Sequence, residues 1–460
     1  MAPDRDYPLW MRGAVAAGNR HTAEAGAWAL AHGGNAVDAV VAASLAGFVA
    51  EGPLTGPAGG GFLLLRDAGK EPAVLDCFFA VPTRRRGAMD EVLIDFGDAS
   101  TQVFHVGPSS VAVPGLVAGL AEAHDEHGRI PWPELFAPAL ELASSGVEMT
   151  GPQRFLLEIL VPILERTDEG RRIYGSRVRA ETAAMVGGLE LLRDHGSAAV
   201  GALLPELADD IASYRVIERR PEEAVFCGMR VVTCPPPSLG GGVVARGLAA
   251  LDGWRADAGP VLAVALADAL RQGYGGSAGT GFTGTTHVSV IDGDGNAAAL
   301  SSTLGSGSGV FSQGFQLNNM LGELDVIGTV DRPPGERLPS MMAPTLVLDG
   351  DQPRLVVGSA GSVRLSGAIL QSIRHVVAGG LDVHAAIDHP RLHVEDDVVQ
   401  IEGGWPPEAA EELLQAGQRV NPWAGRNLYF GGVSAVERQP DGSLGAAGDP
   451  RRGGHGIVVP

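Results

Sequence analysis

Two short runs of alternating apolar and polar residues flank a turn in the second half of the chain. Residues 285–291 and 297–303 are rich in Thr, Val, Ala and Ser, and the five residues between them read Asp-Gly-Asp-Gly-Asn. Such runs on both sides of a turn rich in Asp, Gly and Asn are typical of a β-hairpin. The pattern therefore predicts that Thr285 opens one strand and that Thr303 lies on its partner.

Elsewhere the periodicity predicts blocks of helices between short buried strands. Helices are expected at residues 22–30, 36–48, 117–127, 133–143, 154–164, 261–272, 365–378 and 407–416. Strands are expected at residues 62–65 and 73–78, near 216, 231 and 310, at 345–348 and 355–357, and between 428 and 459. This mixture favours α+β layers. No linker or internal repeat divides the chain, so we expect residues 1–460 to form one domain.

The residues directly before Thr285 are small and flexible. Gly predominates from Gly275 to Gly284, and such a run accommodates a strained or cleavable peptide bond. Together with a threonine that opens a strand, it suggests an N-terminal nucleophile made by self-cleavage between Gly284 and Thr285.

Composition excludes several classes of partner. The chain has 460 residues, 45% of them hydrophobic and 19% charged, which is enough to bury a large core. A formal net charge of -20 disfavours binding to nucleic acid or to an anionic membrane. The basic runs at 84–86 and 451–452 are short and are expected to be surface charge. The apolar stretch 39–50 is too short to span a membrane.

The cysteines and the first residues of the chain indicate the cellular compartment. Cys77, Cys227 and Cys234 cannot all pair and lack zinc-type spacing, so no disulfide framework is expected. Residues 1–7 carry acidic charge and lead to no apolar segment of a secretory signal. We therefore expect a cytoplasmic protein.

Two patterns that resemble ligand sites have simpler explanations. Residues 292–296 begin like a calcium loop but lack its sixth-position glycine and flanking helices, so a hairpin turn is expected. His124 with His127, and His389 with His393, lie at helical intervals without a third ligand. The glycines at 59–61 lack the Lys-Ser/Thr of a phosphate loop, which favours close backbone packing. No metal and no cofactor are expected.

A series of motifs identifies a family that the chain resembles. The strand that begins at Thr285, the Asp-Gly-Asn turn and Thr303 are similar to those of the γ-glutamyltranspeptidase family. Further matching strings, in the family's order, lie at residues 33–39, 59–62, 113–120, 235–238, 317–319, 342–345, 358–364 and 386–391. The resemblance therefore runs over nearly the whole chain.

The resemblance implies a fold and a mechanism. The fold is the four-layer αββα N-terminal-nucleophile hydrolase fold, cut into fragments 1–284 and 285–460 that stay associated. Thr285 would be the nucleophile, and its own α-amine, with a pKa near ~7.7–8.0, would be the base. His287 is then unnecessary as a base and is interpreted as a core histidine.

Other site residues are carried over from the family's motifs. Thr303 would orient the nucleophile, and the backbone N–H groups of Gly361 and Ser362 would bind the oxyanion. Glu323 would hold the amine of the substrate. Asn319 and Ser340 also fall at substrate-binding positions.

The substrate positions depart from the family's pattern. Phe78 stands where γ-glutamyl enzymes have an arginine for the substrate carboxylate, so an aromatic wall and weak activity on ordinary γ-glutamyl amides are expected. Arg84, Arg85 and Arg86 are alternative sources of that charge. Pro339-Ser340 replaces a pair of serines, and Gly305 replaces an asparagine.

Three functions remain open at this point. The first is a self-processed hydrolase or acyltransferase acting on a γ-glutamyl or related acyl amide. The second is a relative recruited to another bond, such as removal of an acyl or oxalyl group in natural-product biosynthesis. The third is a binding protein without turnover. The partner is a small molecule in each case, and a higher oligomer is possible.

Overall fold

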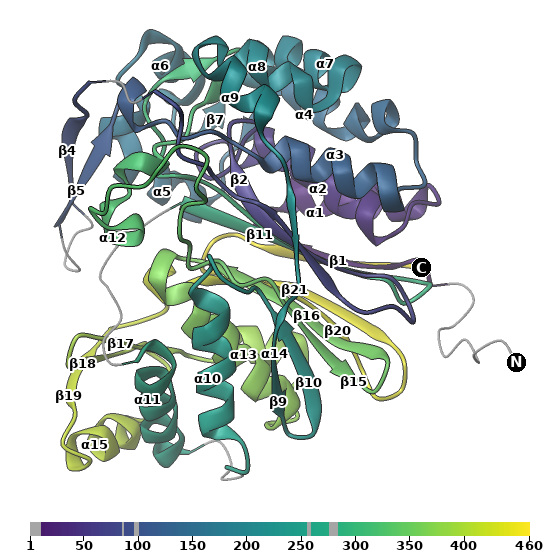
Figure 1. The fold of residues 1–460 in the computed structure, drawn as a ribbon. Coiled ribbons are helices and arrows are strands. Elements are labelled where there is room, and N and C mark those ends of the chain that lie inside the picture. Colours follow the sequence, from purple (N-terminus) through teal and green to yellow (C-terminus); the bar gives the residue numbers. More distant parts are fainter. Residues whose placement is uncertain (1–10, 85–86, 96–100, 255–258, 276–283) are drawn as a thin grey trace, which may run out of the picture.

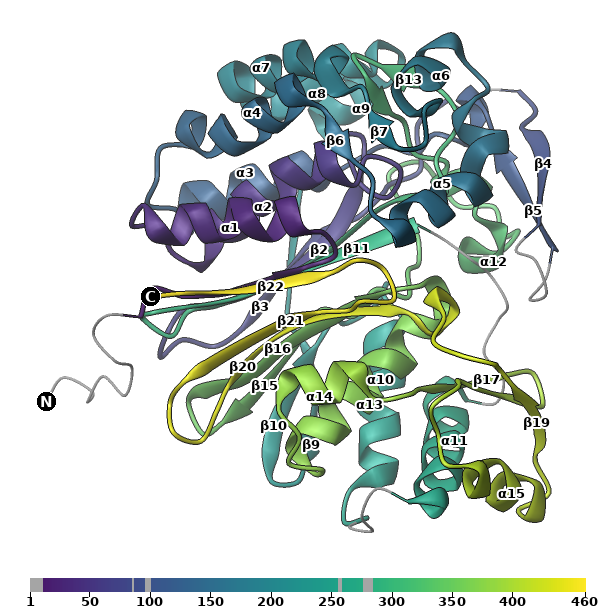
Figure 2. The same ribbon diagram turned by 180° about the vertical axis from the view of Figure 1, so that it is seen from behind.

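Two antiparallel sheets face one another between two layers of helices. The computed structural model describes residues 11–84, 87–95, 101–254, 259–275 and 284–460. Figure 1 shows the four layers, and Figure 2 shows the same arrangement from behind. The four-layer αββα fold expected from the resemblance is confirmed.

The first sheet has seven strands and contains the predicted hairpin. In spatial order it consists of β22 (His455–Val459), β1 (Gly13–Ala17), β11 (Gly284–Asp292), β12 (Ala297–Gly305), β2 (Gly60–Arg66), β3 (Ala73–Cys77) and β8 (Ile217–Arg219). β11 lies near the middle of the sheet, between β1 and β12, and all nine of its residues are buried.

The second sheet has six strands, all joined to their neighbours by antiparallel pairing. It consists of β21 (Leu444–Gly448), β20 (Gly432–Arg438), β16 (Gln352–Ala360), β15 (Thr345–Asp349), β10 (Met229–Thr233) and β9 (Glu222–Phe226). Apolar side chains from the inner faces of both sheets share one core.

Helices cover the outer face of each sheet. Over the first sheet lie α1 (Arg20–Ala31), α2 (Ala36–Ala50), α3 (Leu116–His127), α4 (Ala137–Ser145), α5 (Gly151–Leu164), α6 (Asp168–Tyr174), α7 (Val186–His195), α8 (Val200–Leu203) and α9 (Ala208–Ser213). Over the second lie α10 (Gly240–Leu251), α11 (Pro260–Tyr274), α13 (Leu365–Val377), α14 (Val383–Asp388) and α15 (Pro407–Gln415).

Smaller elements complete the fold. They are the hairpins β4–β5 (Asp90–Asp95, Thr101–Val106), β6–β7 (Val147–Glu148, Arg179–Ala180) and β13–β14 (Phe311–Ser312, Phe315–Gln316), the short helix α12 (Leu324–Ile327), and the sheet β17–β19 (Leu392–Glu395, Val398–Ile401, Arg419–Pro422). None of the described helices is long and apolar enough to cross a membrane.

Helix α2 shows how local signals and packing cooperate. Asn35 caps it in a capping box with Asp38, as its position before the apolar run predicts. All fifteen residues of α2 are buried, because Ala and Gly allow close approach on every side. The first free N–H of the helix, that of Ala36, donates to Asp292 Oδ2 in the hairpin turn, at 2.9 Å. The turn of the β11–β12 hairpin is thereby fixed to the start of α2.

Several sequence-based expectations about elements are corrected. The helix expected at 133–143 begins as a 3-10 turn, Trp132–Phe136, and continues as α4. His389 and His393 do not share a helix, since one caps α14 and the other lies on β17.

Helix α10 was not anticipated because it begins with three glycines. A Cβ on Gly241 would lie 1.9 Å from the carbonyl oxygen of Cys234, so tertiary contact and not helix propensity selects glycine there.

The expectations for the glycines at 59–61 and for the turn at 292–296 are confirmed. Added Cβ atoms at Gly59, Gly60 and Gly61 would lie 2.6 to 2.8 Å from neighbouring atoms, which shows close backbone packing. All three cysteines are free thiols. Asp292 accepts hydrogen bonds from within its own turn, as expected of a hairpin. Within the described ranges, no group of three acidic, His or Cys side chains is placed to hold a metal.

Candidate active site

The peptide bond between Gly284 and Thr285 lies at an irregularity of the central hairpin. Gly284 pairs with Gly305 and Thr286 pairs with Ser302, so two residues of β12 face the single residue Thr285. Such bulges bend a strand and re-aim side chains, and they are frequent next to active sites. Residues 276–283, most of the flexible run noted in the sequence, lie outside the described residues.

Thr303 touches the bond that is expected to be cut. Its hydroxyl donates a hydrogen bond to the carbonyl oxygen of Gly284 and accepts one from the backbone N–H of Gly305 at 2.8 Å. The hairpin brings the two threonines together, as the sequence predicts. The contact of Thr303 is, however, with the carbonyl before Thr285, where a hydroxyl donor polarises the C=O bond for attack.

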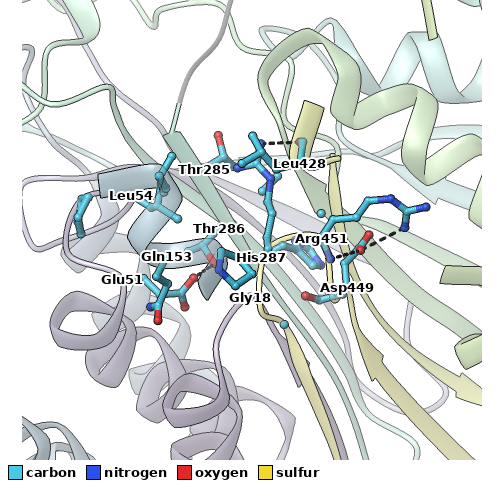
Figure 3. Close-up of a pocket in the computed structure, with 18 of the residues that line it drawn as sticks. Gly18, Glu51, Leu54, Gln153, Thr285, Thr286, His287, Leu428, Asp449 and Arg451 are labelled. Atoms are coloured by element: carbon cyan, nitrogen blue, oxygen red, sulfur yellow. Dashed lines mark hydrogen bonds and ion pairs between the residues drawn. The ribbon is translucent and has the colours of Figure 1, made fainter. Parts of the chain in front are cut away.

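Thr285 lines a pocket between the first sheet, the end of α2, helix α5 and the C-terminal segment. Figure 3 shows Thr285, Thr286 and His287 on β11, with Glu51 on one side and Asp449 and Arg451 on the other. The cavity has a volume of about 40 Å³, room for roughly three water molecules. Apolar side chains make up much of its wall: Pro53, Leu54, Met149, Pro152, Leu156, Leu157, Leu428 and Val433.

Glu51 is a buried carboxylate in this pocket. Its two oxygens accept hydrogen bonds from the hydroxyls of Thr22 and Thr286, each at 2.6 Å. Burial raises the pKa of Glu51, because the charged form loses its hydration, and the two hydroxyl donors lower it by less. The side chain of Thr286, the residue after the expected nucleophile, is therefore bound to an acid on α2.

His287 is a satisfied core residue, as predicted. Its ring nitrogens lie 2.8 Å from the hydroxyl of Ser301 and 2.9 Å from that of Ser289. Burial lowers the pKa of His287 to about 3. The ring packs directly on Gly358 of the second sheet, where a Cβ would lie 2.2 Å from it. The imidazole is thus neutral and fixed between the sheets.

The predicted oxyanion turn follows β16, whose last residue, Ala360, lines the same pocket. Gly361 has φ 131° and Ser362 has φ 56°, a left-handed conformation that is uncommon for a residue with a side chain. The carbonyl of Val363 accepts a hydrogen bond from the hydroxyl of Tyr274 at 2.6 Å. Arg364 stacks over the ring of Tyr429. These contacts hold the turn in place.

Glu323 and Asn319 hold the loop that follows β12. Glu323 Oε1 accepts from the N–H of Ser306 at 2.7 Å, and Asn319 Oδ1 accepts from the same group at 2.8 Å. A Cβ on Gly305 would lie 2.3 Å from Asn319 Oδ1, so this packing requires glycine there. Burial raises the pKa of Glu323 to about 7. Its Oε2 is buried with no hydrogen-bond partner among the described residues.

Ser340 lies apart from this loop and is tied to the segment around the prolines at 235–237. Its hydroxyl accepts from the N–H of Met342 at 3.1 Å, and its carbonyl accepts from that of Leu239 at 2.7 Å. Glu323, Asn319 and Ser340 do not line the pocket at Thr285.

Phe78 does not form the expected wall of the pocket at Thr285. It is buried in the core between the sheets, stacked on Phe62 with ring centroids 5.2 Å apart and edge-on to Phe79. It is absent from the residues that line that pocket. Arg84 borders a different cavity, while Arg85 and Arg86 lie outside the described residues.

Sequence reasoning missed the two arginines that border the pocket. Arg451 is buried, not surface-exposed as expected, and binds Glu402 through two of its nitrogens and Asp449 through a third contact. The stem of Arg452 lies on Gly432, where a Cβ would be 2.4 Å from Arg452 Cδ. Burial lowers the pKa of Arg452 to about 10. The signal available in the sequence was the Asp-Pro-Arg-Arg string at 449–452 in a chain otherwise poor in basic runs.

Comparisons with known proteins identify the family of the chain. The model of the family described as gamma-glutamyltranspeptidase matches residues 22–184 and 269–459. The chain is 27% identical to the acylase ACY 1 proenzyme of Pseudomonas sp. (strain SE83), over 97% of this chain and 94% of that protein. It is 26% identical to the glutathione hydrolase proenzyme of Escherichia coli (strain K12), over 96% and 90%.

A solved structure supports the same fold. The crystal structure of cephalosporin acylase from Bacillus halodurans matches with a TM-score of 0.83 at 21% identity, covering 99% of this chain and 97% of that one. At this identity the match establishes the architecture and leaves the substrate to be argued from the site.

Proposed function

Since the chain belongs to the gamma-glutamyltranspeptidase family, we propose that it cuts its own backbone between Gly284 and Thr285 and then acts as an N-terminal-threonine hydrolase or acyltransferase on an acyl amide. The observation that carries this proposal is the hydrogen bond from the Thr303 hydroxyl to the Gly284 carbonyl, beside a buried Thr285 at a bulge.

The mature enzyme would contain its own base. Cleavage turns the amide nitrogen of Thr285 into an α-amine with a pKa near ~7.7–8.0, which takes the proton of the hydroxyl as it attacks the substrate carbonyl. The backbone N–H groups of Gly361 and Ser362 are the donors for the oxyanion. Their role does not depend on the serine side chain, because backbone amides do the work in such turns.

The pocket bears on the class of substrate. With Phe78 in the core, the reason to expect weak activity on γ-glutamyl amides no longer applies at this pocket. Arg452 borders the cavity, whereas Glu323 lies outside it, on the loop that follows β12. The small volume of the cavity, about 40 Å³, favours a short acyl amide, of which a γ-glutamyl amide is one. Recruitment to another acyl group, such as an oxalyl group, uses the same acyl-enzyme chemistry.

Processing is tested first. Denaturing electrophoresis and N-terminal sequencing of the purified protein should show fragments 1–284 and 285–460, the second beginning with Thr285. Thr285→Ala should stay intact and inactive, because it lacks the attacking oxygen. A wild-type chain without a new threonine terminus, or a Thr285→Ala chain that is still cut at this bond, contradicts the proposal.

Turnover is tested on the processed protein. The substrates are p-nitroanilides that carry a γ-glutamyl group, a glutaryl group, the neutral methyl ester of the glutaryl group, or an oxalyl group. The measurement is the release of p-nitroaniline. Thr303→Ala should retain some processing and turnover, since Thr303 assists and does not form the covalent bond. A correctly processed protein that releases no product from any acyl amide would instead support the binding-protein hypothesis.

A further inference from the structure

The self-cleavage step lacks the base that serves the mature enzyme. Before the cut, the nitrogen of Thr285 is an amide with no basic lone pair, so it cannot accept the proton of the Thr285 hydroxyl. That proton must still leave as the oxygen attacks the carbonyl carbon of Gly284. The uncut chain therefore needs a different proton acceptor near Thr285.

Two candidate bases in the pocket are poorly suited. Asp449 lies 2.6 Å from a guanidinium nitrogen of Arg391 and also binds Arg451, and the pKa of its carboxyl is lowered by these charges. His287 has both ring nitrogens at hydrogen-bond distance from serine hydroxyls, and its pKa falls to about 3. A group with so low a pKa is a weak base and is poorly suited to remove the proton of a hydroxyl.

The other acidic side chain at the pocket is Glu51. It caps the C-terminus of α2, is 4% exposed, and no cation pairs with it within the described part of the chain. Its pKa is raised by burial, so its carboxylate is more basic than an ordinary glutamate. Its neighbours are neutral hydroxyls on two elements, Thr22 on α1 and Thr286 on β11. The charged groups that line the same pocket are Asp449, Arg451 and Arg452.

The backbone at Gly18 covers the carboxylate of Glu51. Gly18, which follows β1, also lines the pocket. A Cβ at Gly18 would lie 2.6 Å from Thr286 Oγ1 and 2.7 Å from Glu51 Oε2. Only glycine allows the chain to cover the hydrogen bond between Glu51 and Thr286 without displacing it. The carboxylate is therefore held against Thr286, the residue that follows the expected nucleophile.

The cavity that Glu51 and Thr285 both line can hold the proton carrier. Its volume of about 40 Å³ exceeds what one water molecule needs. Thr285, Thr286 and Glu51 all line it and supply the polar partners that an ordered water requires. Proton transfer through one water is an established route for a general base.

We propose, as an extension that rests on the proposed function, that Glu51 accepts the proton of the Thr285 hydroxyl during self-cleavage, through a water molecule in this pocket. The Thr285 oxygen forms a bond to the Gly284 carbonyl carbon, and the Thr303 hydroxyl stabilises the charge on the carbonyl oxygen. The C–N bond then breaks, and the proton returns from Glu51 to the Thr285 nitrogen. A second water hydrolyses the resulting ester, giving the Gly284 carboxylate, the Thr285 hydroxyl and a free amine.

Maturation and turnover use different bases, so the two rates are measured separately. Full-length chain made by cell-free synthesis is shifted to buffers from pH 5 to pH 9, and the appearance of fragment 285–460 is followed by denaturing electrophoresis. The wild-type rate should rise with pH as Glu51 loses its proton and then level off. Glu51→Gln should be slower by about 100-fold or more, the usual contribution of a general base, and should lose this rise.

Turnover of the matured variant is the second readout. After long incubation, processed Glu51→Gln should hydrolyse the acyl amide within about threefold of wild type, because the α-amine is then the base. Glu51→Asp should recover part of the cleavage rate. The matched control is Glu437→Gln, a buried glutamate that binds Val383 and Arg354 away from the pocket, and it should be cut at the wild-type rate.

Stability is compared in chains that cannot be cut. Thermal unfolding of Thr285→Ala and of the Thr285→Ala, Glu51→Gln double variant should give similar midpoints.

The inference is overturned if Glu51→Gln matures at the wild-type rate with the same pH profile, or if it slows maturation and mature turnover by the same factor. A wild-type chain that never shows the Thr285 terminus would instead overturn the proposed function and, with it, this extension.

Discussion

Phe78 lies where the family resemblance expects an arginine for the substrate, two residues after Asp76, and the structure uses both residues for the scaffold. Asp76 is fully buried and pairs with Arg219 at 2.8 Å and with Arg337 at 3.5 Å. It also accepts a hydrogen bond from the backbone N–H of Phe78. Arginines are thus near this strand end, but they neutralise a buried carboxylate, and the Phe78 ring fills the core.

Phe78→Arg should therefore destabilise the protein instead of creating a carboxylate site. The ring is 1% exposed, and an unpaired charge in its place costs several kcal/mol. We expect insoluble protein or a thermal midpoint lowered by about 3–5 °C, since a chain of this length loses roughly 1 °C per kcal/mol. Phe78→Leu, a control that keeps the position apolar, should cost only about 1–2 kcal/mol. A folded Phe78→Arg protein that gains γ-glutamyl hydrolysis would show that this position faces the substrate after all.

At the scale of elements, the predicted oxyanion turn joins β16 to α13 and is held by parts of the chain on both sides of the expected cut. Tyr274, the last residue of α11, donates to the turn from the 1–284 side. Gly431 approaches it from the other side, since a Cβ on Gly361 would lie 2.9 Å from Gly431 Cα. The turn is thus a rigid element whose backbone donors are set by packing.

Ser362→Gly should stabilise this turn and leave turnover intact. A residue with a side chain at φ 56° carries conformational strain of about 1 kcal/mol that glycine relieves. The serine hydroxyl is also buried without a hydrogen-bond partner among the described residues, so its removal loses no contact of that kind. Differential scanning calorimetry should show an equal or higher midpoint, with kcat within about threefold of wild type. A loss of more than about tenfold in kcat would assign a catalytic role to the side chain.

At the scale of the whole molecule, the expected cut divides both sheets. The segment before Thr285 supplies β1, β2, β3 and β8 to the first sheet and β9 and β10 to the second, and the segment after it supplies the remaining strands. In the first sheet, β1 lies between β11 and β22, and β12 pairs with β2. Neither segment has a complete sheet of its own.

The two fragments should therefore remain associated after processing. On size-exclusion chromatography under native conditions they should co-elute at or above the mass of the whole chain, 47.4 kDa, and separate only in denaturant. Thermal unfolding should show one transition for both fragments, because they share one core. Two separate native peaks at the fragment masses would contradict the interleaved sheets as the basis of the mature enzyme.

The sequence by itself was sufficient where the determining contacts are local. Alternation around the turn at 292–296 predicts the hairpin, because a strand has a two-residue period and a turn needs Asp, Gly and Asn. Asn35 predicts the start of α2, because a cap acts within three residues. The position of Thr285 at the start of β11 follows from the same local pattern, and the family resemblance adds its chemistry and the four-layer fold.

Tertiary structure alone decided which side chains surround Thr285. Glu51 lies 235 residues from Thr286 in the chain, and their hydrogen bond exists only because α2 packs against β11. Arg451 appeared as surface charge in the sequence, yet Glu402 and Asp449, brought together by folding, pair with it in the interior. Phe78 was expected to form the wall of a pocket, and the structure places it in the core. Periodicity records how a residue relates to its near neighbours, whereas the burial and charge of a site depend on segments that only the fold brings together.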